Sequence, residues 1–344
     1  MNNRFAFLEM RSANHLLGDV EGLRAQLDED GYLLFRQVLD REVVKDLRGH
    51  MLATLARRGW VEPPRIPISS RCLIAPLRED DEEYLEGYQD VQRLELFHRL
   101  AHDPALLGIV RDVLGETAFP HPLKIARIAF PDHFEASTPP HQDYPNNQGT
   151  PSLTAAWIPV TPMVGAMGGL AVLRGSHKWG RLPLARHLGA GNRCAVVPDD
   201  MAEACHWVTT DYDLGDLLLF PSLTVHAALD NAHEFDLRLS VDFRYQLEGE
   251  PLTPIVLEPH FQRLTWDEIY AGWKHTDLQY YWRDLDYEVV PFESFPLENH
   301  DGSSEFTEAQ MREIFEYTER VKARSARRLA AIEAEREAAA AAEP

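Results

Sequence analysis

The middle of this chain is a succession of short apolar runs, each closed by glycine, proline, asparagine or aspartate. The clearest runs are Leu123 to Phe130, Leu153 to Val160, Gly169 to Leu173, Asp216 to Phe220 and Leu237 to Gln246. Runs of this length with turn residues between them are typical of antiparallel strands in a sandwich or barrel. The pattern therefore predicts a mainly β core at about 120–250 and confines the helices to its flanks.

The segment before the core carries helical signals. Residues 3–30 show leucines near helical spacing, and the apolar stretch 32–35 then predicts a buried strand. Asp40 is a suitable N-cap for a helix from about 41 to 57. We expect the helical part, residues 1–115, to buttress the β core.

The segment after the core is irregular and aromatic up to about residue 300. Within residues 251–300, Thr265 begins a capping box that predicts a short helix. A second capping box at Thr307 precedes an Ala/Glu/Arg-rich stretch with no apolar face in its last turns. We expect a single domain over residues 1–300 and a long C-terminal helical extension, residues 305–344, without chemistry of its own.

Composition narrows the classes of function. The formal net charge of −21 repels phosphate backbones and anionic lipid, so we expect neither nucleic-acid nor membrane binding. The sequence shows no apolar run of membrane-spanning length and no signal-peptide apolar region. Cys72, Cys194 and Cys205 are scattered, which argues against a disulfide framework and for a cytoplasmic location. The expected partner is a small molecule, and homo-oligomerisation stays open.

His141 and Asp143 place an imidazole and a carboxylate two residues apart. On a strand, positions i and i+2 point to the same face, so both side chains could reach one divalent metal. A third ligand must come from another strand. His226 is the best choice, because the apolar strand 217–220 leads into it and the intervening chain is long enough to return to the mouth of a barrel.

Two histidines and one carboxylate leave three octahedral positions open, as non-haem Fe(II) oxygenases need. Zinc accepts the same ligands, so ligand type alone does not decide between the metals. Residues 238–245 add a second signal, because they alternate strictly between polar and apolar side chains. An ordinary sheet with its polar face in water gives this pattern too.

The position of that strand favours a functional reading. It directly follows His226, so its polar face can point into the barrel mouth, where Arg238 could clamp a carboxylate through two parallel hydrogen bonds. A metal beside a carboxylate clamp suits a 2-oxo diacid, whose keto-acid end chelates iron while its distal carboxylate pairs with arginine.

These residues together resemble the phytanoyl-CoA dioxygenase family of Fe(II)/2-oxoglutarate-dependent oxygenases. The motifs that carry the resemblance are, in order, Asp30-Gly31-Tyr32-Leu33, His141-Gln142-Asp143, Thr154-Ala155-Ala156-Trp157-Ile158-Pro159, Gly168-Gly169-Leu170 to Gly175-Ser176-His177-Lys178, His226 and Arg238. The match covers roughly residues 27–246. The family implies a double-stranded β-helix, or cupin-like jelly roll, that uses Fe(II) with 2-oxoglutarate and O2 as co-substrates.

The resemblance also implies roles for single residues. His141, Asp143 and His226 would bind iron, and Arg238 would bind 2-oxoglutarate, with Trp157 packed near it. Further contacts to the co-substrate or substrate would come from Gln142, Lys124 and Arg127. Relatives often place a hydroxyl residue two positions after the second iron histidine, to help the arginine hold the carboxylate. This chain has Ala228 there, so Thr224 or Ser240 would have to supply the hydroxyl.

The implied reaction is hydroxylation of an aliphatic C–H bond, with release of succinate and CO2. Asp143 argues against a halogenase of this type, which would leave that position vacant for halide. Three alternatives stay open: a non-catalytic metal-binding jelly roll, a zinc hydrolase and an acyl-CoA hydroxylase. The first two give Arg238 no role, and the third should show a basic cleft for coenzyme A.

Substrate choice would lie in the less regular segments. Pro63 to Cys72 and Pro251 to Phe295 are expected to form the specificity lid, with Arg65, Arg71 and Trp273 as the proposed contacts. A small polar metabolite or a natural-product intermediate is the expected substrate. His177 lies in a turn that is structural in the family, so we leave it out of the ligand set.

Overall fold

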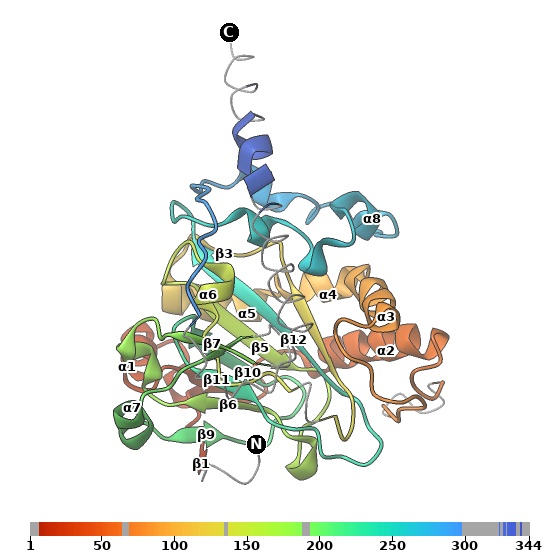
Figure 1. Cartoon of the computed structure of the whole chain (residues 1–344), viewed down its shortest axis with the longest axis horizontal. Coiled ribbons are helices and arrows are strands. Elements are labelled where there is room, and N and C mark those ends of the chain that lie inside the picture. The colour runs from red at the N-terminus through yellow and green to blue at the C-terminus, as the bar shows by residue number, and fades with distance from the viewer. Residues whose placement is uncertain are drawn as a thin grey trace.

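The computed structural model describes residues 7–63, 69–133, 137–187 and 193–297, together with helical positions 323, 326–327, 329–334 and 338. Its centre consists of two β-sheets with helices around them (Figure 1). The six-stranded sheet has the order β2 (Leu33–Phe35), β10 (Leu217–Pro221), β5 (Thr154–Pro159), β12 (Arg238–Leu247) and β3 (Ala118–Pro120), and β4 (Ile125–Ala129) also pairs with β12. The four-stranded sheet has the order β1 (Leu8–Glu9), β9 (Trp207–Thr209), β6 (Leu170–Leu173) and β11 (His226–Ala228). A separate pair joins β7 (Leu184–Arg186) to β8 (Arg193–Ala195).

The two larger sheets form the predicted double-stranded β-helix. All pairings in the six-stranded sheet are antiparallel, as the short runs with turn residues indicated. Side chains on its inner face, such as Trp157 and Phe220, pack with Leu170 and Val172 of the four-stranded sheet. This packing closes the core between the sheets.

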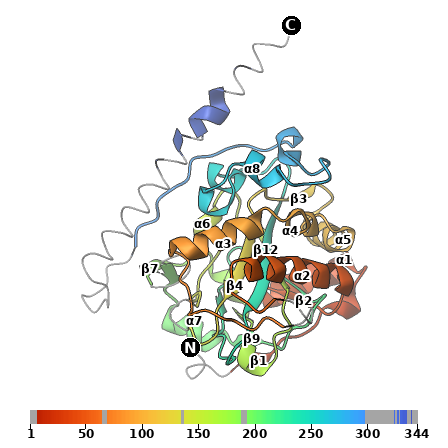
Figure 2. The same ribbon diagram turned by 90° about the vertical axis from the view of Figure 1, so that its right-hand side faces the viewer.

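The outer face of the six-stranded sheet packs against a layer of helices. These are α1 (Val20–Asp30), α2 (Arg41–Arg57), α3 (Glu82–Gln92), α4 (Glu95–Leu100) and α5 (Pro104–Leu114). On β12, Leu239, Val241 and Phe243 point into this layer and are fully buried. Figure 2 shows α2 and α3 in front of β4 and β12, which is the buttress that the sequence predicted.

The N-terminal segment is less helical than the leucine spacing suggested. Helix α1 begins only at Val20, where Asp19 accepts a hydrogen bond from the backbone N–H of Gly22, and it ends at Gly31 in a left-handed conformation. Before it, β1 pairs in parallel with β9, and a single 3-10 turn follows at Asn14–Leu16. Sheet pairing at β1 overrides the local helical pattern. By contrast, β2 and α2 begin and end close to where they were expected.

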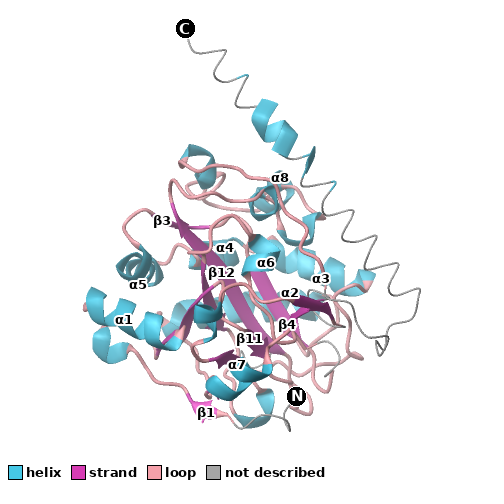
Figure 3. Ribbon diagram, turned by 60° about the vertical axis from the view of Figure 1, so that its left-hand side comes forward, coloured by secondary structure: helices cyan, strands magenta, loops and turns pink. Residues whose placement is uncertain are grey.

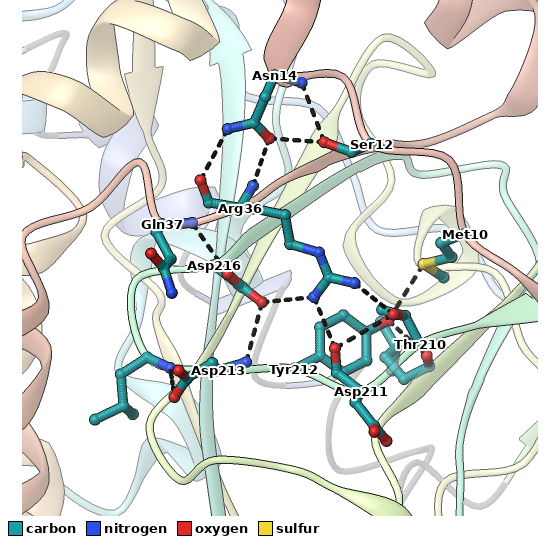
Figure 4. Close-up of polar contacts among 12 residues, drawn as sticks. Met10, Ser12, Asn14, Arg36, Gln37, Thr210, Asp211, Tyr212, Asp213 and Asp216 are labelled. Carbon is teal, nitrogen blue, oxygen red and sulfur yellow. Dashed lines mark hydrogen bonds and ion pairs between the residues drawn. The ribbon is translucent and has the colours of Figure 1, made fainter.

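A polar cluster around Arg36 attaches the N-terminal segment to the β core (Figure 4). The Arg36 guanidinium forms a 2.8 Å ion pair with Asp216, whose other oxygen accepts from the backbone N–H of Gln37 at 3.0 Å. The side chain of Asn14 bonds both the N–H and the carbonyl of Arg36. The cluster joins the end of β2 to the turn before β10 and lies away from the pocket described below.

The aromatic segment after β12 packs over the β3 end of the six-stranded sheet (Figure 3). The capping box at Thr265 is present and begins α8 (Trp266–Tyr270). The other short helices are α6 (Tyr144–Asn147) and α7 (Asp199–Ala204). Ile332, one of the helical positions near the C-terminus, is buried in the same aromatic cluster. The capping box expected at Thr307 lies outside the described residues.

Candidate metal centre and co-substrate pocket

His141 and His226 lie directly opposite each other as a hydrogen-bonded antiparallel pair. The backbone N–H of His141 donates to the carbonyl of His226 at 2.9 Å, and the reverse bond is 3.0 Å long. Their rings are 4.1 Å apart between centroids. The second histidine therefore returns to the first across the barrel, as the spacing between them suggested.

Asp143 joins the two histidines through a turn rather than a strand. Only His141 makes a β-bridge, whereas Asp143 has helical backbone angles and precedes α6. Its carbonyl accepts from the backbone and side chain of Asn147. The expected strand alternation of His141 and Asp143 is thus wrong, although the turn still brings both side chains to one point. Asp143 Oδ1 lies 3.8 Å from Nε2 of His141 and 3.9 Å from Nε2 of His226.

The protonation of the two rings fits metal binding. Nδ1 of His141 lies 2.8 Å from the carbonyl of Pro139, and Nδ1 of His226 lies 3.0 Å from the carbonyl of Thr224. A carbonyl can only accept, so each Nδ1 carries the proton and each Nε2 presents a lone pair. The metal-binding atoms of the three residues all lie within 4.8 Å of one another. Among the described residues, this is the one cluster of its kind.

Electrostatics keep these ligands in their metal-binding forms. Burial, with a further contribution from His226, lowers the pKa of His141 to about 3, and burial also lowers the pKa of His226. Burial alone would raise the pKa of Asp143, but Arg244 and the two histidines outweigh it and hold the pKa below its usual range. At neutral pH the centre offers two neutral imidazoles and one carboxylate.

The polar face of β12 forms a wall of the pocket beside this centre. Arg238, Ser240, Asp242 and Arg244 all line it and are nearly inaccessible to solvent. The face that a solvated sheet would expose is therefore turned inward, as the position after His226 predicted.

Arg238 contacts backbone carbonyls rather than carboxylates in the described part of the chain. Its guanidinium donates to the carbonyls of Leu229 and Met167. It makes no ion pair with a carboxylate of the described part of the chain. Burial lowers its pKa to about 10, so it stays charged at neutral pH. The carboxylate of Asp230 offsets part of this effect without forming an ion pair, and a carboxylate bound directly to Arg238 would offset more of the cost of burying the cation.

Ser240, Trp157 and Arg127, which were predicted to contact the co-substrate or substrate, also line the pocket. Trp157 packs on Tyr212, with ring centroids 4.8 Å apart. Ala228 lines the pocket without offering a hydroxyl. Of the two suggested replacements, Thr224 donates its hydroxyl to the carbonyl of Gly31 and does not line the pocket, which leaves Ser240.

Gln142 and Lys124 differ from expectation, because neither lines the pocket. The amide of Gln142 donates to the carbonyls of Gly180 and Leu223 and accepts from the N–H of Leu182, so it braces neighbouring loops. Lys124 lies just before β4, where its ammonium contacts the hydroxyl of Tyr281 at 3.3 Å and nearby carbonyls. Burial lowers the pKa of Lys124 to about 7.

The residues suggested for the lid are also placed apart from the pocket. Arg71 lies over the ring of Phe235 and pairs with Glu62, and the indole of Trp273 donates to the carbonyl of Arg93. Neither lines the pocket, and Arg65 lies outside the described residues. His177 bonds the carbonyl of Asp28, consistent with a structural role.

Three pocket residues were missed at the sequence level. Arg244 and Asp242 lie on the alternating face that pointed to Arg238, so their spacing could have revealed them. Arg244 binds Asp143, and Asp242 binds both Arg244 and Arg127. Glu79, which lines the mouth from the loop before α3, has no such signal in its sequence context.

This fold and this centre define the class of iron-dependent oxygenases built on a jelly roll. Residues 27–238 match the family model described as phytanoyl-CoA dioxygenase, and the chain belongs to that family. It is an Fe(II)/2-oxoglutarate-dependent oxygenase, and Fe(II), 2-oxoglutarate and O2 are its cofactor and co-substrates.

Characterised relatives carry hydroxylase names. The chain is 29% identical over 256 residues to a 1-deoxypentalenic acid 11-beta-hydroxylase of Streptomyces arenae, covering 70% of this chain and 86% of the relative. It is 28% identical over 242 residues to the enzyme of the same name from Streptomyces exfoliatus, covering 67% and 82%. The solved structure of the epimerase SnoN with Fe3+, alpha ketoglutarate and nogalamycin RO is 20% identical, with a TM-score of 0.49 and coverage of 68% and 86%.

Among the described residues, no helix is both long and apolar enough to cross a membrane.

Proposed function

We propose that the chain hydroxylates an aliphatic C–H bond of a small, largely apolar metabolite from natural-product biosynthesis. The observation that carries the proposal is the composition of the pocket. His141, His226 and Arg238 line one part of it, while Leu77, Tyr84, Phe130 and Phe220 contribute apolar wall. Such a wall binds a hydrocarbon skeleton by burial and excludes water from the reacting bond. The names of the two relatives, hydroxylases of 1-deoxypentalenic acid, support a small-molecule substrate.

In this proposal His141, Asp143 and His226 hold Fe(II), and Arg238 binds the distal carboxylate of 2-oxoglutarate. When bound, the iron and 2-oxoglutarate supply the oxidising chemistry: O2 and 2-oxoglutarate yield succinate and CO2, and one oxygen atom enters the C–H bond. Arg238 and Ser240 orient the co-substrate, and Trp157 packs beside it. The apolar wall places the substrate carbon near the metal ligands. Proximity and orientation are therefore the protein's contribution to the reaction.

A polar group of the substrate would lie at the pocket mouth. Glu79 forms no hydrogen bond with another described residue, and burial raises its pKa. Arg127, which lines the same pocket and carries the opposite charge to Glu79, already donates to Asp242 through Nε and Nη2. We therefore propose that a hydroxyl or another hydrogen-bond donor of the substrate donates a hydrogen bond to Glu79. An acyl-CoA would instead need several cations for its phosphates at this mouth.

The test is a succinate-release screen with Fe(II), 2-oxoglutarate and a panel of alicyclic acids, alicyclic alcohols, aliphatic amines and acyl-CoA thioesters. We expect one alicyclic class to stimulate succinate release and to gain the mass of one oxygen atom. Asp143→Ala should abolish both signals. Activity that is lost on chelation and restored by zinc would contradict the proposal, as would selective stimulation by acyl-CoA.

We place the enzyme in the cytoplasm, acting on a diffusible small molecule rather than on nucleic acid or a membrane. The supporting observations are three free cysteines, Cys72, Cys194 and Cys205, and the strongly acidic charge balance.

A further inference from the structure

Arg244 makes the closest contacts to the proposed metal ligand Asp143. Its Nε donates to Asp143 Oδ2 at 3.0 Å and its Nη2 donates to Asp143 Oδ1 at 2.9 Å. Its remaining nitrogen, Nη1, donates to Asp242. The arginine and the two aspartates are almost completely buried. The guanidinium therefore has a carboxylate on each side, and each of its three nitrogens already donates to one of them.

The two oxygens of Asp143 are not equivalent in this arrangement. Oδ1 is the atom that lies 3.8 and 3.9 Å from Nε2 of His141 and His226. Oδ2 accepts the hydrogen bond from Nε of Arg244. A carboxylate can bind a metal through one oxygen or through both. The second mode would occupy a position that this chemistry needs for 2-oxoglutarate or O2.

We propose that Arg244 is a positioning residue that presents Asp143 to the metal through Oδ1 alone. The inference rests on the proposed metal centre. By holding both oxygens on its fork, the guanidinium fixes the carboxylate plane with Oδ1 toward the two histidines and keeps Oδ2 on Nε, which leaves three metal positions for the co-substrates. A fork with two parallel donors can fix that plane, whereas a single point charge cannot.

Asp242 and Arg127 hold the arginine in turn. Arg127 donates to Asp242 Oδ1 through Nε at 3.1 Å and to Asp242 Oδ2 through Nη2 at 3.3 Å. Asp242 and Arg244 are two positions apart on β12, so they share the inward face of the strand. Charges alternate along Arg127, Asp242, Arg244 and Asp143, from the pocket wall to the metal centre. In such a buried network each partner limits the movement of the next.

The test compares Arg244→Lys with wild type and with Arg36→Lys. The control makes the same chemical change in an ion pair with a buried aspartate, Asp216, outside the pocket. Two titrations are made without O2 on each protein: Co(II) by calorimetry, and 2-oxoglutarate by the visible charge-transfer absorption of its complex with saturating Fe(II). Thermal melts of the metal-free proteins report folding separately.

We expect Arg244→Lys to bind Co(II) about 10 to 100 times more weakly, the usual range for partners of metal ligands. At saturating Fe(II) its charge-transfer absorption with 2-oxoglutarate should be weaker or shifted, because the lysine leaves Oδ2 free to bind the metal. Arg36→Lys should match wild type in both titrations. If Arg244→Lys does not fold, Asp242→Asn loosens the same arginine from its other side and should show a smaller loss in the same direction.

Unchanged Co(II) affinity and an unchanged 2-oxoglutarate spectrum in folded Arg244→Lys would overturn the positioning role and leave the metal centre standing. Equal losses in Arg244→Lys and Arg36→Lys would overturn it too, since they would reflect general destabilisation. If wild type itself bound no Co(II), the metal centre would be wrong, and the inference would fall with it.

Discussion

The two ends of β12 carry the same side chain on the same inward face, yet they use it differently. At one end Arg238 donates only to backbone carbonyls. At the other, Arg244 is enclosed by Asp143 and Asp242. The difference follows from neighbours rather than from residue type. An arginine whose charge is already balanced can hold another residue in place, whereas a buried arginine without a direct ion-pair partner can bind a charged ligand.

The pKa values express the same contrast. Burial lowers the pKa of Arg238 to about 10. Burial would lower the pKa of Arg244 as well, but Asp143 and Asp242 outweigh it and raise the value. The free energy of each site thus depends on a different anion, one external and one internal. Substitutions at the two ends should therefore separate co-substrate binding from metal binding.

The largest separation is expected from Arg238→Met, which removes the cation and keeps the volume. Two charge-assisted hydrogen bonds contribute about 1.5–3 kcal/mol each, so the affinity for 2-oxoglutarate should fall at least about 100-fold. Co(II) affinity should stay within about twofold of wild type, because Arg238 makes no contact with the ligand triad. Calorimetric titration with each ligand checks both expectations. A comparable loss of Co(II) affinity would contradict the assignment of separate binding roles to the two ends of β12.

A smaller effect is expected from Ser240→Ala, which lies beside Arg238 on the same face and offers the pocket a hydroxyl in place of the one missing at Ala228. Loss of one neutral hydrogen bond costs about 0.5–1.5 kcal/mol, so the 2-oxoglutarate Kd should rise about 3- to 10-fold. Thr224→Val is the control, because Thr224 bonds Gly31 outside the pocket. If the Thr224 variant lost the co-substrate and the Ser240 variant did not, the assignment would be reversed.

Lys124→Met is expected to have the smallest effect on ligand binding and to change only the stability of the fold. The folded-state pKa of Lys124 is about 7, well below the usual value of about 10.4, so the unfolded chain binds a proton that the folded chain rejects. Wild type therefore loses stability as the pH falls from about 10 to 7, and the variant does not. The denaturation midpoint of the variant should exceed that of wild type by more at pH 6 than at pH 9. A difference in denaturation midpoint that does not change with pH would contradict the lowered pKa of Lys124. Weakened 2-oxoglutarate binding would contradict the placement of Lys124 outside the pocket.

Residue patterns were sufficient to predict much of this architecture. Turn-bounded apolar runs predicted an antiparallel sandwich or barrel, which the family resemblance narrowed to a jelly roll, and the alternation from Arg238 to Tyr245 predicted a strand with a functional face. Periodicity identifies a strand and its face directly, because the side chains on a strand alternate with period two. The N-terminal exception, β1, arose because pairing with β9 depends on chain almost two hundred residues away.

Contacts between distant segments were not predictable in the same way. The sequence put Lys124 near the motif strand, but its ammonium meets Tyr281 of the aromatic segment. Gln142 lies between two ligands, yet its amide bonds loops around Gly180 and Leu223. A side chain's partner is set by the three-dimensional surroundings, which neither spacing nor polarity specifies. The same reason hid the contact between Arg244 and Asp143, residues that are 101 positions apart.

The division of labour along β12 is tested most directly by titrating Co(II) and 2-oxoglutarate into Arg238→Met and Arg244→Lys side by side. The arrangement predicts a crossed result. Arg238→Met should lose 2-oxoglutarate and keep Co(II), while Arg244→Lys should lose Co(II) and alter the 2-oxoglutarate complex even when metal is saturating. Parallel losses of both ligands in both variants would contradict separate roles for the two arginines.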